Sequence, residues 1–309
     1  MRSFERILAV VDPYAEAQPA VHRAAVLAHK SAATVDLLIC NYDDHLAGTR
    51  FGDSDGLRAS RKQMMESARD ALERLAGPLR NDGLEVNVHT VFYHPLHEGI
   101  ISKASELGSD LVVKDTHYHH LLKRTVFANT DWELIRECPV DLMLIKTDGW
   151  SADPVILAAV DPSHIGDKPA RLDHAILRQG MAINELLGGT LRVVHNYPLS
   201  LPAAAVGAGL ATPGSDTQSL NKSIEQTHRQ ALDRLLQGYE IGADNVLLVA
   251  GEPRRQLVAM AQSQHADIMV VGAVSRSRLK RVFLGFTALH ILDRLPCDLL
   301  IVKARAVLT

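Results

Sequence analysis

Glycines and basic residues gather near the C-terminal end of the chain, in the stretch VVGAVSRSRLKRVFLGFT from Val270 to Thr287. Gly272 ends an apolar run, and a residue without a Cβ lets backbone N–H groups come close to a phosphate. Gly285 and Thr287 stand where the next helix is expected to begin, and free N–H groups and the helix dipole favour an anion there. Arg276, between the glycines, supplies countercharge. These residue types predict a site for a phosphorylated ligand.

Three acidic or imidazole side chains follow other apolar runs. Asp12 ends ILAVVD, Asp161 ends ILAAVD, and His195 ends LRVVH. A carboxylate in such a place can accept hydrogen bonds from the amino or hydroxyl groups of an adenine or a ribose. It can equally cap the helix that follows, and the sequence leaves both interpretations open.

Histidines mark a second candidate site. His117 and His119 form an H-x-H pattern, and His94, His97 and His120 are expected on loops at the same edge of the fold. Imidazole is a common ligand for zinc or copper. Exposed loop histidines also occur without any metal, so a zinc site at His117 and His119 is one of two alternatives.

No catalytic set is predicted. The chain contains neither a G-x-x-x-x-G-K-[ST] phosphate loop nor a G-x-S-x-G nucleophile elbow. His97 and Glu98 begin like H-E-x-x-H, but Ile101 stands where the second histidine is required. Cys138 and Cys297 flank prolines and apolar runs, which is typical of core residues.

The elements that position these residues occur twice. ILAVVDP at residues 7–13 and ILAAVDP at residues 156–162 agree at six of seven positions. DLMLIK from Asp141 and DLLIVK from Asp298 match in a frame that also aligns Thr130 with Thr287. Internal repetition of this kind indicates a tandem duplication. We expect two domains, at residues 1–148 and 154–309, joined near residues 147–153.

Short apolar runs alternate with helical segments in each copy. Strands are predicted at residues 6–12, 35–42, 85–92, 110–114 and 141–146, and again at 155–161, 190–195, 245–249, 267–272 and 298–303. A helix is predicted at residues 63–80 from apolar positions at helical spacing. Such alternation predicts an α/β fold of two doubly wound five-strand parallel sheets. Ligands bind beyond the carboxyl ends of strands in such folds, which places Asp161, His195 and Gly272 on one edge.

The chain resembles the tandem-domain members of the universal stress protein family over essentially its full length. The resemblance rests on VVDP with QPA soon after, on FANTDWELIRECP in copy one, and on FLGFTALHILDRLPCDLLIVK in copy two. It implies a cytoplasmic stress-response protein with the fold of the adenine-nucleotide alpha-hydrolase-like proteins. Nucleotide-binding members carry Gly-x-x-Gly, nine residues, then Gly and Ser or Thr. Such members imply ATP or AMP, with Mg²⁺, as a ligand.

The two copies depart from that nucleotide pattern to different degrees. In copy two, Ser275 replaces the second glycine and Phe286 replaces the Ser or Thr, with Thr287 one position late. In copy one, Asp115 stands in place of Gly272, and bulky residues follow it. A carboxylate at the start of a phosphate loop would repel the ligand. We therefore expect a degenerate loop in the first domain and a partly retained one in the second.

The composition of the chain limits the classes of binding partner that we expect. The chain has 309 residues, with 33 Lys and Arg against 36 Asp and Glu, and its formal net charge of −3 favours neither nucleic acid nor a membrane surface. Three cysteines without C-x-x-C spacing predict neither a disulfide framework nor a thiolate zinc site and fit a reducing cytosol. We expect a small-molecule partner, an intramolecular pseudo-dimer of the two copies, and a homodimer as a further possibility.

Three functions stay open from the sequence. The first is a noncatalytic regulatory protein that holds an adenine nucleotide or another phosphorylated ligand in copy two. The second is a slow ATP hydrolase that uses the same pocket. The third is a scaffold whose pockets are vestigial or hold an apolar ligand. The Pro-, Gly- and Ala-rich segment 199–216 is either a lid or an inert insertion.

Overall fold

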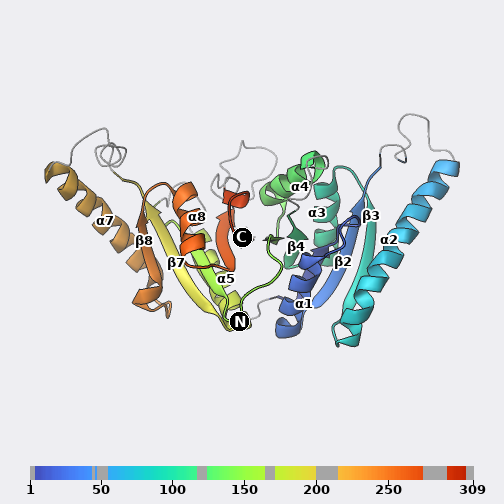
Figure 1. Ribbon diagram of the computed structural model, residues 1–309, viewed down its shortest axis with the longest axis horizontal. Coiled ribbons are helices and arrows are strands. Elements are labelled where there is room, and N and C mark those ends of the chain that lie inside the picture. Colours follow the sequence, from blue (N-terminus) through green and yellow to red (C-terminus); the bar gives the residue numbers. More distant parts are fainter. Residues whose placement is uncertain are drawn as a thin grey trace, which may run out of the picture. The chain divides into compact units, whose positions relative to one another are not determined.

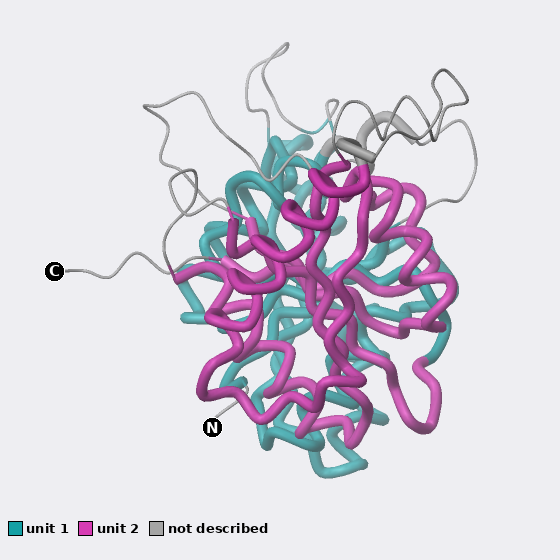
Figure 2. The backbone as a smooth tube through the Cα atoms, turned by 90° about the vertical axis from the view of Figure 1, so that its left-hand side faces the viewer, with its two compact units in different colours: residues 1–149, 275–280, 305–309 teal, residues 150–274, 281–304 magenta. Residues whose placement is uncertain are grey.

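The structure is a computed structural model (Figure 1) that describes residues 4–43, 46, 55–116, 124–163, 171–199, 215–273 and 291–303. For residues 124–129 and 215–217 it describes the backbone alone. The described chain divides between Gly149 and Trp150 into two compact units (Figure 2). The helices that the structure describes include no candidate for a membrane-spanning segment.

The first unit is a parallel sheet with helical crossovers. Its elements are β1 (Arg6–Val10), α1 (Pro19–Ser31), β2 (Thr34–Asn41), α2 (Asp55–Asn81), β3 (Val86–Phe92), α3 (Leu96–Leu107), β4 (Leu111–Asp115), α4 (Arg124–Glu137) and β5 (Asp141–Ile145). The strand order is β3-β2-β1-β4-β5, and all neighbours are parallel. The chain adds β2 and β3 on one side of β1 and then adds β4 and β5 on the other side, so the strand order switches between β1 and β4. Doubly wound sheets bind their ligands beyond the carboxyl ends of strands at such a switch.

The second unit repeats this arrangement. Its elements are β6 (Val155–Val160), α5 (Leu172–Leu187), β7 (Thr190–Tyr197), α7 (Ser215–Leu236), a 3₁₀ turn (Ala243–Asn245), β8 (Val246–Ala250), α8 (Pro253–Ser263), β9 (Ile268–Ala273) and β10 (Asp298–Lys303). The order β8-β7-β6-β9-β10 is that of the first unit, again all parallel. The predicted fold class, two tandem doubly wound five-strand sheets, is confirmed.

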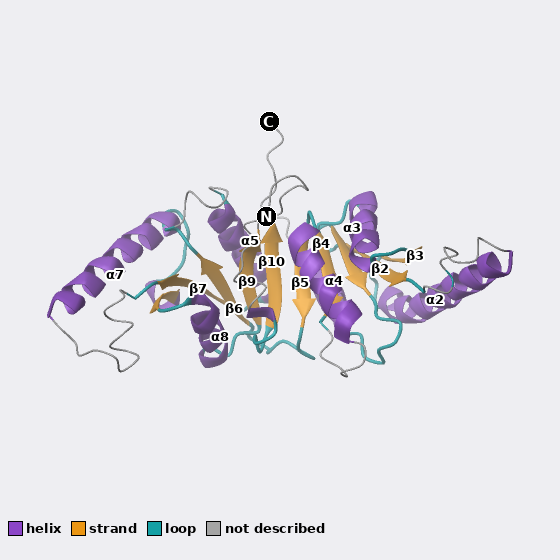
Figure 3. Ribbon diagram, turned by 90° about the horizontal axis from the view of Figure 1, so that it is seen from above, coloured by secondary structure: helices purple, strands orange, loops and turns teal. Residues whose placement is uncertain are grey.

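Two strands are buried along their whole length. Every residue of β4 and of β10 is buried. Successive side chains of a strand point to opposite faces, so both faces of each sheet must be covered, and helices lie on both sides of the strands (Figure 3). Burial on both faces explains why strands such as β4 and β10 read as nearly continuous apolar runs, whereas the half-buried β3 alternates with polar residues.

Helix α2 is longer than the sequence predicts. It runs from Asp55 to Asn81, whereas apolar spacing predicted residues 63–80. Its buried positions are Ala68, Leu72 and Ala76, each four residues apart on one face. The residues of the first two turns, which the prediction missed, are almost all polar or exposed. They therefore lack the apolar residues at helical spacing from which a helix is predicted.

In each unit, an equivalent aspartate accepts hydrogen bonds from the backbone at the start of the first strand. Asp110 Oδ2 accepts hydrogen bonds from the backbone N–H groups of Glu5 and Arg6, at 2.8 and 3.0 Å. Asp267 accepts from the N–H groups of Ser151 and Val155, at 2.7 and 2.9 Å. Both aspartates were expected to begin a strand. In the structure they directly precede β4 and β9, and their carboxylates accept hydrogen bonds from backbone donors of the neighbouring segment.

Candidate functional site

The carboxyl edge of the second sheet gathers four polar side chains. Asp161 and Ser163 follow β6, His195 lies in β7, and His228 comes from α7. His228 Nδ1 lies 2.8 Å from both Ser163 Oγ and His195 Nε2. The Asp161 side chain is 45% exposed, whereas that of His195 is 0% exposed. The cluster therefore presents a carboxylate to solvent above a buried imidazole.

The buried imidazole of His195 has a defined protonation state. Its Nδ1 lies 3.1 Å from the carbonyl oxygen of Val160, which can only accept, so Nδ1 carries the proton. Nε2 is then an acceptor for the Nδ1–H of His228. Burial lowers the pKa of His195, although Asp161, 4.0 Å from Nδ1, acts in the opposite direction. His195 is therefore a neutral hydrogen-bond acceptor at neutral pH.

An aromatic side chain flanks the cluster. The ring centroid of Tyr197 lies 5.7 Å from that of His228. Burial and the neighbouring Glu225 raise the pKa of the Tyr197 phenol, which consequently stays protonated. The cluster thus combines an apolar ring with hydroxyl, imidazole and carboxylate groups. Such a combination suits a ligand that has both a flat apolar part and hydroxyl groups.

The first unit has no equivalent of His195. Val35 pairs with Ile7 in the first sheet as Leu191 pairs with Ile156 in the second. Because Ile7 and Ile156 are equivalent in the repeat, the position of His195 is held by Ile39, which is fully buried. A buried apolar side chain thus stands where copy two has an imidazole.

Neither Asp12 nor Asp161 caps the helix that follows it. The N-cap residues of α1 and α5 are Gln18 and Arg171. Asp12 Oδ1 instead accepts a hydrogen bond of 2.8 Å from the backbone N–H of Tyr14. Of the two interpretations left open by the sequence, helix capping is therefore not what these carboxylates do.

The glycine at position 272 has a packing role. Gly272 lies inside β9, which continues to Ala273, and it does not close the strand as the sequence suggested. A Cβ built at this residue would lie 2.7 Å from Cγ of Leu172, the first residue of α5. The close approach of α5 to β9 is a sufficient reason for glycine. A contact between Gly272 and a phosphate stays a prediction.

Most of the predicted glycine loop lies outside the described residues. This holds for Ser275, Arg276, Gly285, Phe286 and Thr287. The H-x-H pair, His117 and His119, lies outside them as well, and so does the segment 200–214. Of the predicted nucleotide residues, Asp161, His195 and Gly272 are described, and all three lie at or next to the carboxyl ends of β6, β7 and β9.

In the first unit, a carboxylate of the chain lies at the corresponding end of β4. Asp115, the equivalent of Gly272, is buried, and its Oδ1 accepts a hydrogen bond of 2.7 Å from the backbone N–H of Ala20 in the first turn of α1. Beside it, Lys114 forms a buried ion pair with Asp131, 2.7 Å between Nζ and Oδ1. A helix N-terminus favours an anion, and here a carboxylate of the chain supplies it.

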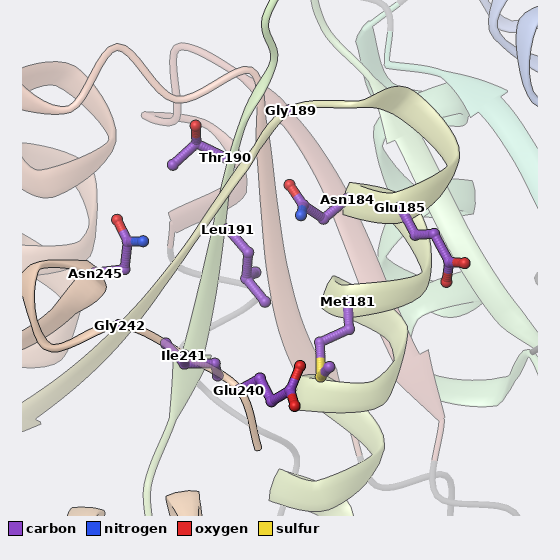
Figure 4. A pocket seen from close by; sticks show the side chains of 10 residues that line it. All are labelled: Met181, Asn184, Glu185, Gly189, Thr190, Leu191, Glu240, Ile241, Gly242 and Asn245. Carbon is purple, nitrogen blue, oxygen red and sulfur yellow. The ribbon is translucent and has the colours of Figure 1, made fainter.

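A cavity of about 350 Å³ lies at the other edge of the second sheet, where β7 begins (Figure 4). It is lined by Met181, Asn184, Glu185, Gly189, Thr190, Leu191, Glu240, Ile241, Gly242 and Asn245. The two charged residues of this lining are glutamates, which disfavour a phosphorylated ligand. This cavity is distinct from the polar cluster at the carboxyl edge.

Comparisons with known proteins agree with the repeat. The sequence pattern of the family described as Universal stress protein family matches residues 3–146 and, a second time, residues 155–303. The chain is 27% identical over 304 residues to Universal stress protein E from Escherichia coli (strain K12), which covers 98% of this chain and 95% of that protein. A Universal stress protein E homolog from Haemophilus influenzae is 26% identical over 305 residues, 97% of each chain.

Two solved structures resemble the whole chain. A functionally unknown protein from Pseudomonas aeruginosa PAO1 has a TM-score of 0.74 at 25% identity, and the match covers 98% of this chain and 94% of that chain. A universal stress protein from Archaeoglobus fulgidus DSM 4304 has a TM-score of 0.63 at 17% identity, covering 97% of this chain and 98% of that chain. The second likeness concerns the fold alone.

Proposed function

The chain belongs to the universal stress protein family, and we propose that its second copy binds an adenine nucleotide, ATP or AMP, without turning it over. One observation carries this proposal. Asp161, Ser163, His195 and His228 meet at the carboxyl edge of β6 and β7, beside the switch in strand order where doubly wound sheets bind ligands.

The chemistry of the cluster suits a nucleoside. The exposed carboxylate of Asp161 accepts hydrogen bonds from ribose hydroxyls or from an amino group, which are donors that adenosine offers. The hydroxyl of Ser163 can donate or accept. The phosphates would extend towards the basic stretch that contains Arg276, as the sequence predicts. Mg²⁺ would accompany ATP as its counterion.

The first copy is excluded from this proposal on physical grounds. Asp115 places a buried carboxylate at the N-terminus of α1, where a phosphate would otherwise be favoured. A phosphate there would meet a like charge at short range in a buried environment, which is strongly unfavourable. The proposed stoichiometry is therefore one nucleotide per chain.

Calorimetric titration with ATP and Mg²⁺ tests the proposal through a matched pair of variants. Asp161→Ala should weaken binding roughly ten- to a hundredfold, because hydrogen bonds to a charged group contribute about 1.5–3 kcal/mol. Asp12→Ala, the equivalent change in copy one, should leave the dissociation constant unchanged. Equal effects of the two variants, or no heat of binding at millimolar nucleotide, would contradict the proposal. A side chain at position 272 is a poorer probe because it would meet Leu172.

Phosphate release distinguishes this proposal from the alternative of a slow ATP hydrolase. Because no catalytic set is predicted, we expect release no faster than in a buffer control. Release that is lost in Asp161→Ala and retained in Asp12→Ala would show hydrolysis at this same site. Release that survives in both variants would originate in a contaminant.

A further inference from the structure

Three potential metal ligands converge between two helices of the first unit. They are His97 in the first turn of α3, and Glu133 and Glu137 in α4. One ligand atom from each residue lies within 4.8 Å of the other two. Helices α3 and α4 contact one another (Figure 1). This cluster is separate from the polar cluster of the second unit and from the buried Lys114–Asp131 pair.

The backbone fixes the positions of all three side chains. Glu133 and Glu137 are four residues apart on α4, so their carboxylates project from the same face one turn apart. His97 is held where α3 approaches β2 closely, because a Cβ at Gly99 would lie 2.8 Å from both Cys40 Sγ and Tyr93 Cβ. A donor set carried on two packed helices is more rigid than one carried on loops.

A carboxylate at the C-terminal end of a helix is in an unfavourable place unless a cation neutralises it. Glu137 is the last residue of α4, where the helix dipole disfavours negative charge, and Glu133 lies one turn earlier. His97 Nε2 lies 3.7 Å from Glu137 Oε2, which is too long for a hydrogen bond. Arg136, on the same helix, pairs with Glu133 at 3.1 Å. The guanidinium of Arg136 thus balances Glu133, whereas the Glu137 carboxylate lies beside the imidazole of His97.

We propose that His97, Glu133 and Glu137 bind a divalent transition-metal ion, with Zn²⁺ as the representative ion, and that the ion clamps α3 to α4. One imidazole nitrogen and two carboxylate oxygens are ligands that zinc accepts, and they leave a coordination position for water. The side chains are 13%, 23% and 43% exposed in this order. The ion can therefore enter from solvent, while His97 stays largely enclosed.

The second copy supplies an internal comparison. In the ungapped frame that aligns Pro139 with Pro296, Glu133 corresponds to His290 and Glu137 corresponds to Arg294. Pro95 before α3 corresponds to Pro253 in α8, which places Arg255 at the position of His97. Two of the three ligands are thus replaced by cations, and the proposed site belongs to copy one alone.

The site differs from the H-x-H pair that the sequence suggested. His97 is one of the histidines expected near that pair, but in the structure it faces two glutamates of α4. Variants can therefore separate the two sites. Glu133→Gln and Glu137→Gln remove one ligand each from the proposed site. The double variant His117→Ala and His119→Ala removes the H-x-H pair and leaves the proposed site intact.

Zn²⁺ titration calorimetry and the visible spectrum of the Co²⁺-loaded full chain test the proposal. We expect one Zn²⁺ per chain, a dissociation constant weakened at least about tenfold in each Glu→Gln variant, and an altered Co²⁺ spectrum. The H-x-H double variant should bind as the unchanged chain does. Circular dichroism in EDTA should show that Glu137→Gln is folded, since its side chain is 43% exposed.

Two results would overturn the proposal. One is the absence of Zn²⁺ binding at millimolar concentration in the full chain. The other is binding that is lost in the H-x-H double variant but unchanged in both Glu→Gln variants. In addition, Zn²⁺ should raise the melting temperature of the unchanged chain. It should raise that of Glu133→Gln less.

Discussion

The replacement Gly272→Ala tests whether packing explains the glycine in β9. The backbone of Gly272 has no positive φ, so alanine meets no conformational barrier there. The added Cβ would lie 2.7, 2.8 and 2.9 Å from Cγ, Cδ2 and Cδ1 of Leu172. Overpacking of a core costs about 1–3 kcal/mol. The lower chain entropy of alanine in the unfolded state offsets about 0.5–1 kcal/mol of that cost. We expect a net loss of about 1–2 kcal/mol.

A double-mutant cycle isolates the contact. Leu172 is 5% exposed, and Leu172→Ala alone should cost about 2–5 kcal/mol. The free energy of unfolding, measured by urea denaturation of the four proteins, should show the double variant to be more stable than the sum of the single effects by about 1–2 kcal/mol. Additive effects within about 0.5 kcal/mol, or a stabilised Gly272→Ala protein, would refute the packing explanation. The glycine would then require another cause, such as a ligand.

Three further predictions concern the first unit. Asp115→Ala should lower the free energy of unfolding by about 2 kcal/mol because it leaves the N–H of Ala20 without its acceptor, whereas Asp115→Asn should cost less; equal costs would contradict the capping role. Burial alone would raise the pKa of Asp36, but hydrogen bonds from Arg6 and a neighbouring histidine lower it. The stability it contributes is complete above its unfolded pKa of about 4 and is lost as pH falls through the lower folded pKa. In urea titrations at different pH values, the free energy of unfolding of Asp36→Asn should therefore fall less steeply below about pH 5 than that of the unchanged chain. An equally steep fall would show that Asp36 is not the group responsible. Burial raises the pKa of the Cys40 thiol to about 12, so a thiol reagent at pH 8 should label the native chain slowly and label all three cysteines quickly in denaturant; rapid native labelling of Cys40 would contradict its burial.

The fold could be predicted from the sequence because burial on both faces gives most of the inner strands a nearly continuous apolar run. The match between ILAVVDP and ILAAVDP then shows the duplication. The bounds were less accurate where polar residues continue an element, as in the first turns of α2. Tertiary contacts determine these turns, and local spacing does not record them.

The candidate site was predicted in part. Asp161 and His195 could be located because each ends an apolar run that leads to the same edge of the sheet. His228 could not be, because it lies in α7, a largely polar helix that follows an insertion and has no motif around it. Asp115 was expected to repel a phosphate, but its hydrogen bond to Ala20 depends on the approach of α1 to β4. Similarly, Leu172 meets Gly272 only through tertiary packing.

We propose that the two copies of one fold differ in a single function, because the second copy alone binds a nucleotide. Native mass spectrometry of the full chain with ATP and Mg²⁺ counts the bound nucleotides. We expect a complex with one nucleotide per chain, which is weakened by Asp161→Ala and unaffected by Asp12→Ala. Two nucleotides per chain, or none at millimolar ATP, would contradict it.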